Sequence, residues 1–177
     1  AKTYDTKGRI TTMKVAKAIA EILKREGTQF LACYPSQPLI EECAQLGIRP
    51  ILCRQERMGM AIADGFSRTT NGKSIGVFAM QAGPGTENAF PGAAQAFSDN
   101  VPLLLLPGGQ ATQRAFISPG FSAVENYGAV TKWAAQINHA ERVPELMRRA
   151  FYQLRTSKGG PVLLEVPGNI WASELDG

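Results

Sequence analysis

The sequence predicts a doubly wound α/β fold, in which a parallel sheet of about six strands carries helices on both faces. Short apolar runs alternate with helical patterns along the chain, as they do in successive βαβ units. One run, residues 101–106, is apolar without alternation, which is typical of a strand buried on both faces of a parallel sheet. The 177 residues, 44% of them hydrophobic, suffice for one domain with its own core, and we assign residues 1–177 to it.

The first element is expected to be a helix that Thr11-Thr12 caps and Gly27 ends. Its apolar stripe has helical spacing and comprises Val15, Ala18, Ile19 and Ile22. A buried strand over residues 29–34 and a short helix over 39–46 follow. A second strand, over residues 50–53, then leads into the central part of the chain.

The stretch from Cys53 to Phe97 organises the rest of the chain. Glu56 lies where the strand at 50–53 ends and a helix over 56–68 begins. The next strand, residues 74–80, runs into Gly83-Pro84-Gly85 and a second helix. Because the carboxyl ends of parallel strands meet at one edge, where ligands bind, Glu56 and the glycine turn should face one crevice.

The second half continues the alternation. The strand at 101–106 is expected near the middle of the sheet, and the long connection 110–120 is of a length that is usually functional or mobile. A short helix, a strand, an amphipathic helix and a last strand are then expected over residues 121–130, 131–137, 141–157 and 161–166. Residues 170–177 are expected to begin a linker to a further domain.

Composition excludes several classes of function. The net charge of +4 comes from basic residues mixed with acidic ones, which argues against nucleic acid as a partner. No run of about 18 apolar residues and no N-terminal signal region occurs, so no membrane association and a cytoplasmic location are expected. The single histidine, His139, is expected in a surface turn. The three cysteines are Cys33, Cys43 and Cys53, and their spacing is not that of metal ligands. They are expected in the core of a protein from a reducing compartment, and no metal ligand is assigned.

Other chemistries find little support in the sequence. Neither a Gly-x-Ser-x-Gly elbow nor a Walker A loop is present. Gly83-x-Gly85-x-x-Asn88 half-matches a dinucleotide fingerprint, so a nucleotide-binding α/β module is one alternative. In that alternative Glu56 only complements the dipole of its helix. An interaction domain without a ligand is a third hypothesis.

Five motifs in order resemble those of a known family over nearly the whole chain. They are Gln55-Glu56 before a helix that ends in Ala63-Asp64-Gly65-Phe66-Ser67-Arg68, Gly83-Pro84-Gly85 with Asn88, Asp99-Asn100-Val101-Pro102-Leu103 leading to Gly109-Gln110, Thr131-Lys132-Trp133, and Gly160-Pro161-Val162. Together they resemble the N-terminal pyrimidine-binding domain of thiamine diphosphate enzymes. The resemblance is to the group of acetolactate synthase, benzoylformate decarboxylase and related 2-oxoacid enzymes.

The resemblance implies a catalytic role for Glu56. In the family the matching glutamate contacts a ring nitrogen of the cofactor's aminopyrimidine and shares a proton with it. Such sharing needs a carboxylate held in a dry site. The activated cofactor then attacks a 2-oxoacid and stores the electrons that decarboxylation releases.

The resemblance also implies binding roles for other residues. Gly83, Pro84 and Gly85 would allow close approach of the cofactor, with Asn88 behind them. Pro35 stands beside the expected substrate position, where relatives often have Pro-Gly and this chain has Pro35-Ser36. Two glutamines are expected to face substrate, Gln81 and Gln110. The Phe-Gln-Glu motif of acetolactate synthases is missing around Phe121-Ser122.

The family binds the diphosphate through Mg²⁺ with a Gly-Asp-Gly motif in a separate domain, and this chain lacks that motif. The chain therefore resembles half an active site. We expect either the first domain of a three-domain decarboxylase or carboligase, or the small subunit of a split sulfopyruvate-type decarboxylase, inactive on its own. Its expected partner is a diphosphate-binding domain from another subunit of a homodimer or homotetramer. Small residues on the two central helices, such as Gly59 and Gly92, are expected at the subunit contact.

Overall fold

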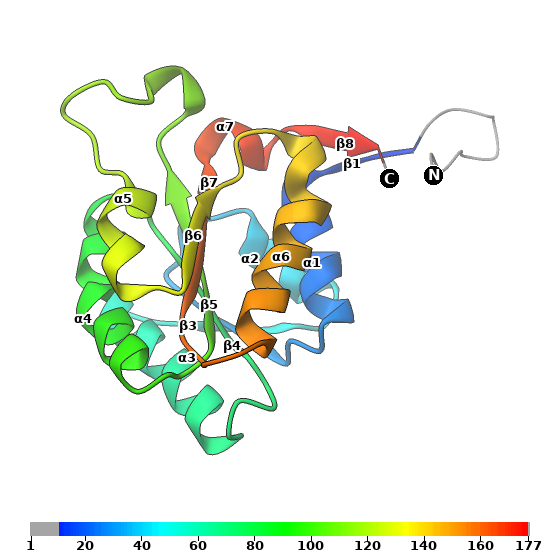
Figure 1. Cartoon of the computed structure of the whole chain (residues 1–177). Coiled ribbons are helices and arrows are strands. Elements are labelled where there is room, and N and C mark those ends of the chain that lie inside the picture. The colour runs from blue at the N-terminus through cyan, green and yellow to red at the C-terminus, as the bar shows by residue number, and fades with distance from the viewer. Residues whose placement is uncertain (1–10, 177) are drawn as a thin grey trace.

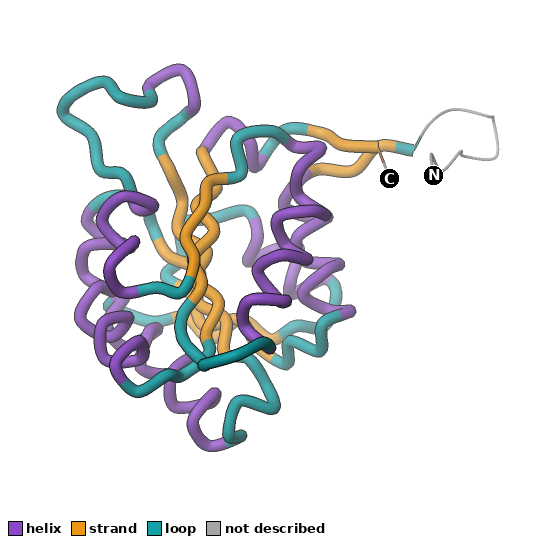
Figure 2. The backbone as a smooth tube through the Cα atoms, viewed as in Figure 1, coloured by secondary structure: helices purple, strands orange, loops and turns teal. Residues whose placement is uncertain are grey.

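A computed structural model describes residues 11–176 and shows three layers, with a parallel six-stranded sheet between two layers of helices (Figures 1 and 2). The strand order is β3-β2-β4-β5-β7-β6, and all neighbours in this sheet are parallel. The predicted fold class is confirmed. The strands are β2 (Phe30–Cys33), β3 (Arg49–Leu52), β4 (Gly76–Met80), β5 (Leu103–Gly109), β6 (Trp133–Gln136) and β7 (Val162–Pro167).

The two faces of the sheet carry different helices, as the two sides of Figure 1 show. One face is covered by α1 (Val15–Arg25), α2 (Leu39–Gln45) and α6 (Val143–Arg155). The other is covered by α3 (Glu56–Thr69), α4 (Pro84–Ser98) and α5 (Ala123–Tyr127). Each face has its own cluster of buried apolar side chains, and β4 and β5 contribute to both. Strands buried on both sides explain the apolar run at 101–106.

Short elements complete the described chain. They are three 3₁₀ turns, Thr112–Arg114, Gly128–Val130 and Ala140–Arg142, and the short helix α7 (Gly168–Trp171). His139 is exposed just before the third turn, as expected. The connection over residues 110–120 projects beyond the carboxyl end of the sheet (Figure 1).

A two-stranded antiparallel ribbon lies beside the main sheet and was not expected. It pairs β1 (Thr12–Lys14) with β8 (Glu174–Asp176), and the hydroxyl of Thr12 donates to Glu174 Oε2 at 2.8 Å. The predicted helix cap at Thr11-Thr12 is therefore wrong, because Thr12 is in a strand and α1 begins at Val15.

The C-terminal tail packs on the domain as far as the structure describes it. Ile170, Trp171 and Leu175 are buried in the cluster formed by α1 and α6. That residues 170–177 begin a linker to a further domain stays a prediction.

The small residues of α3 and α4 pack inside the domain. A Cβ on Gly59 would lie 2.3 Å from the ring of Phe78 in β4, and one on Gly92 would lie 2.5 Å from the side chain of Met60. Contacts this short exclude a larger residue unless its neighbours move. The expectation that these small residues form a subunit contact is therefore wrong: they let α3 and α4 approach each other and the sheet.

Candidate functional site

The carboxyl edge of the sheet holds the residues that the sequence singled out. Between β2 and β4 the order of the strands reverses, since β3 lies on one side of β2 and the later strands lie on the other. In doubly wound sheets such a reversal opens a crevice at the carboxyl ends of the strands, and ligands bind there. The segments that follow β2, β3 and β4 contain Pro35, Glu56 and Gly83-Pro84-Gly85.

Glu56 is the first residue of α3, and only 7% of it is exposed. Its Oε2 accepts a hydrogen bond of 2.8 Å from Nδ2 of Asn88, which lies in the second turn of α4. This bond joins the starts of two neighbouring helices and fixes the orientation of the carboxylate. The structure thus brings together two of the predicted site residues that are 32 positions apart in the chain.

The glycine turn packs directly against this carboxylate. Gly83 has φ of +63° and precedes Pro84, which is the first residue of α4; a positive φ of this kind favours glycine. A Cβ on Gly85 would lie 2.8 Å from Glu56 Oε1 and 2.9 Å from Cβ of Gln81. Position 85 therefore tolerates only glycine without movement of Glu56 or Gln81.

Two buried hydroxyls hold the turn from behind. The hydroxyl of Thr86 donates to the carbonyl of Gln81 at 2.8 Å, and the phenol of Tyr127 donates to the carbonyl of Thr86 at 2.5 Å. Burial raises the pKa of Tyr127, so this phenol keeps its proton and stays a donor. The side chain of Gln81 itself is exposed, as is Pro35.

Gln37 is a site residue that sequence reasoning missed. Its Nε2 donates to the carbonyl of Met80 at 2.6 Å and to the carbonyl of Leu106 at 3.0 Å, so it ties the end of β4 to the middle of β5. Its Oε1 is buried and has no hydrogen-bond partner. The available signal was its place directly after β2, at the point where the strand order reverses.

A second acidic residue at this edge, Glu165 of β7, was also missed. It is only 2% exposed and lies in an otherwise apolar strand. Its Oε2 accepts from Nε2 of Gln136 at 3.1 Å, and its Oε1 accepts from the backbone N–H of Ala123 at 3.5 Å. Burial raises the pKa of this carboxyl group. The signal was a single acid inside the apolar run 161–166.

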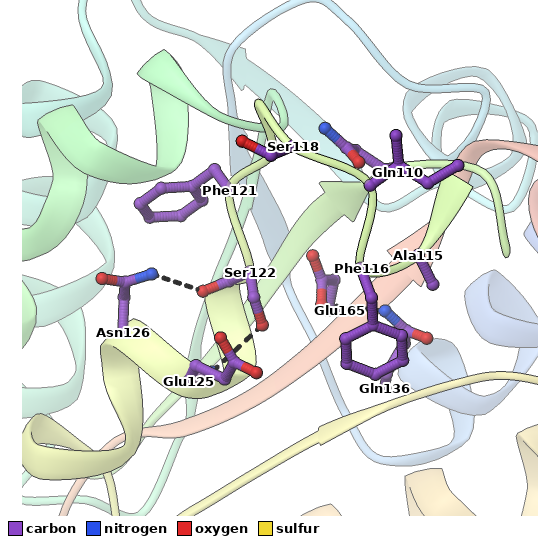
Figure 3. Close-up of a pocket in the computed structure, with 12 residues that line it drawn as sticks. Gln110, Ala115, Phe116, Ser118, Phe121, Ser122, Glu125, Asn126, Gln136 and Glu165 are labelled. Carbon is purple, nitrogen blue, oxygen red and sulfur yellow. Dashed lines mark hydrogen bonds between the residues drawn. The ribbon is translucent and has the colours of Figure 1, made fainter.

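Glu165 lines a cavity of about 310 Å³ beneath residues 115–122, together with Gln110, Gln136 and Phe116 (Figure 3). Gln110 follows β5 and is half-buried. Glu56 and Asn88 are not among the residues that line this cavity. The two glutamines predicted to face substrate therefore lie in different places. Gln81 is next to the glycine turn, and Gln110 lines the cavity.

The three cysteines lie in the interior of the domain. All three cysteines are free and buried, and burial raises the pKa of Cys33 to about 11 and that of Cys43 to about 12. Between residues 11 and 176 no cluster of three or more His, Cys, Asp or Glu side chains could hold a metal ion. Nor does that part of the chain contain a helix long and apolar enough to cross a membrane.

Fold and site together define a doubly wound α/β domain with a buried carboxyl group beside a glycine turn at the carboxyl edge of its sheet. The family model described as "Thiamine pyrophosphate enzyme, N-terminal TPP binding domain" matches residues 13–137. The chain belongs to this family.

Curated relatives come from the acetolactate synthases. The chain is 30% identical over 159 residues to the acetolactate synthase large subunit of Haemophilus influenzae, covering 86% of this chain and 27% of that protein. It is 31% identical over 170 residues to a probable acetolactate synthase large subunit of Methanocaldococcus jannaschii, covering 93% and 28%. It is 32% identical over 164 residues to acetolactate synthase 2 of Nicotiana tabacum, covering 89% and 24%. The chain thus spans about a quarter of the length of these relatives.

Proposed function

We propose that this chain is the pyrimidine-binding domain of a thiamine diphosphate-dependent 2-oxoacid decarboxylase or carboligase, and that Glu56 is its catalytic residue. The observation that carries the proposal is the Glu56 carboxylate, buried and held by Asn88 beside Gly83-Pro84-Gly85. The family match and the acetolactate synthase relatives support the choice of cofactor.

The residues present fit a flat heteroaromatic ring. Because Gly85 has no Cβ, no side chain at this position of the turn covers Glu56 Oε1, and a ring edge would approach that oxygen from the crevice at the carboxyl edge of the sheet. When bound, thiamine diphosphate supplies a carbon nucleophile and an electron sink for 2-oxoacid chemistry. Gly83, Pro84 and Gly85 would hold the pyrimidine side of the cofactor.

Glu56 acts as the group that holds and returns a proton at Oε1. Its Oε2 is engaged by Asn88, so Oε1 is the oxygen free to share a proton with a ring nitrogen. Because the carboxylate is buried, water does not compete with it for that proton. Because its orientation is fixed, no entropy is lost when it aligns with the ring. Asn88 is a positioning residue in this scheme, because it acts through Glu56.

The rest of the site comes from a partner. A diphosphate-binding domain that carries the Mg²⁺ would cover the Glu56 edge, within a homodimer or homotetramer. Two large apolar side chains flank Glu56 in the sequence and remain open to solvent: Leu52 is 62% exposed and Met58 is 57% exposed. Exposed apolar groups beside a half-site suit a surface that another subunit covers.

The test is Glu56→Gln in the enzyme assembled from this chain and its diphosphate-binding domain, with CO₂ release from pyruvate and other 2-oxoacids as the readout. The amide keeps the shape of the side chain but cannot share a proton, so turnover should fall at least about 10²-fold. Glu87→Gln is the matched control, since Glu87 is exposed in the first turn of α4. Equal turnover of the Glu56 variant and the wild type would refute the role of Glu56.

A further inference from the structure

We propose that the cavity beside Glu165 is a binding site for a small molecule that carries an aliphatic ammonium group, with the ammonium against Glu165 and the apolar part against Phe116 and Phe121. This site goes beyond the proposed function. Its ligand need not be the cofactor or the 2-oxoacid, and its occupation can be measured without turnover.

The first support is a buried carboxyl group without a counter-charge. Glu165 forms no ion pair with any described residue from 11 to 176. The other polar side chains that line the cavity are amides, hydroxyls and one further carboxyl group, Glu125, and none of the described lining residues is Lys, Arg or His. A buried carboxyl group either keeps its proton or is paired with a cation. Burial raises the pKa of Glu165, and a cation in the cavity would favour its charged form and pair with it.

The second support is the hydrogen bonding that Glu165 has left over. A carboxylate offers about four lone-pair positions. One is taken by Gln136 and one by the backbone N–H of Ala123, and the backbone N–H of Val124 also interacts with the group. At least one position therefore remains for a donor in the cavity, and an ammonium group has three N–H donors.

The third support is the composition of the opposite wall. Phe116 is fully exposed and lies near Glu165 and Gln136, and the half-buried Phe121 lines the cavity from the other side, with its ring packed towards the apolar cluster of α3 and α4 (Figure 3). Aromatic faces attract cations and cover apolar chains. Acid at the floor and aromatic rings at the rim together suit an alkylammonium ion.

The same residues disfavour other ligand classes. Glu125 lines the cavity as a second carboxyl group, and its charge adds to the negative field at Glu165. An anion such as a carboxylate or phosphate would therefore meet repulsion with no basic side chain to offset it. A divalent metal ion is disfavoured as well, because the described residues offer no cluster of three ligands here.

The experiment titrates n-butylammonium chloride and sodium butanoate into the purified chain, with NMR spectra of ¹⁵N-labelled protein as the readout. The two probes have the same tail and opposite charge. Butylammonium should give saturable shifts of the Gly120 and Ser122 backbone amides and of the Gln136 side-chain amide, and butanoate should bind at least about tenfold more weakly. Equal or tighter binding of butanoate, or no saturable shift with butylammonium, would overturn the proposal.

Two variants sharpen the test. Glu165→Gln removes the charge in an isosteric side chain and should weaken butylammonium binding at least about tenfold. Glu41→Gln should leave binding unchanged, because Glu41 is an exposed residue of α2 on the opposite face of the sheet. Unchanged affinity of Glu165→Gln would also overturn the proposal. If Glu165→Gln does not fold, Phe116→Ala takes its place, because Phe116 is fully exposed; it should weaken butylammonium about threefold, and unchanged affinity would count against the site.

Discussion

Gly85 offers the sharpest separation of a catalytic effect from a stability effect. In Gly85→Ala the new Cβ would lie 2.8 Å from Glu56 Oε1, about 0.6 Å inside ordinary van der Waals contact. The carboxylate or the turn must move by roughly that distance. Misplacement by about 1 Å can cost about 10²-fold in rate, so we expect turnover of the assembled enzyme to fall by about 10-fold to 10²-fold.

The stability of this variant should change much less than its activity. Overpacking costs about 1–3 kcal/mol, but alanine in a helix is favoured over glycine by about 1 kcal/mol, so a net loss of about 0–2 kcal/mol is expected. Gly65→Ala is the matched control, since Gly65 lies in α3 with open space around its missing Cβ. It should gain about 0.5–1 kcal/mol and keep full turnover. Urea unfolding of the chain and turnover of the assembled enzyme measure the two effects, and a folded Gly85→Ala enzyme with wild-type turnover would refute the reasoning.

Three further predictions follow from the same contacts. Gln37→Met removes the hydrogen bonds to the carbonyls of Met80 and Leu106, so urea unfolding should show a loss of about 1–3 kcal/mol; no loss would mean that water replaces the amide. Asn88→Ala frees Glu56 Oε2, and turnover of the assembled enzyme should fall about 10-fold to 10²-fold at unchanged fold, since hydrogen bonds to charged groups are worth about 1.5–3 kcal/mol. Because burial raises the pKa of Cys33 to about 11 and that of Cys43 to about 12 from 9.0, the folded state keeps protons that the unfolded state loses. Their contribution to stability should be complete below pH 9 and decline toward pH 12, and cysteine-free variants should lack this part of the pH dependence.

The sequence was most informative where local chemistry dictates local structure. The apolar run at 101–106 predicted a central strand, and β5 lies between β4 and β7. The strand pattern predicted that Glu56 and the glycine turn lie at one edge of the sheet, and Gly85, which has no Cβ, packs on Glu56. Both follow from properties of neighbouring residues, namely burial on both faces and the missing Cβ.

What escaped prediction depends on contacts between distant parts of the chain. Thr12 is a residue type that often caps helices, but it pairs with Asp176 and is part of a strand. No local sequence pattern indicates a partner so far away in the chain. Glu165 lies in a strand whose other residues are all apolar. Only the fold shows that its side chain contacts Gln136 and the start of α5. The role of Gln37 likewise requires the strand order, because the carbonyls it binds belong to strands 43 and 69 positions later.

The small residues of α3 and α4 show how the fold sets the geometry of the site. Gly59 lets α3 lie against Phe78, and Gly92 lets α4 lie against Met60. The starts of the two helices are thereby close enough for Asn88 to reach Glu56 at 2.8 Å. A larger residue at either glycine would separate the helices and lengthen that bond before it changed any outer surface. The small residues pack inside the domain and hold the carboxylate in place. A surface for a partner is therefore to be sought among exposed side chains such as Leu52 and Met58.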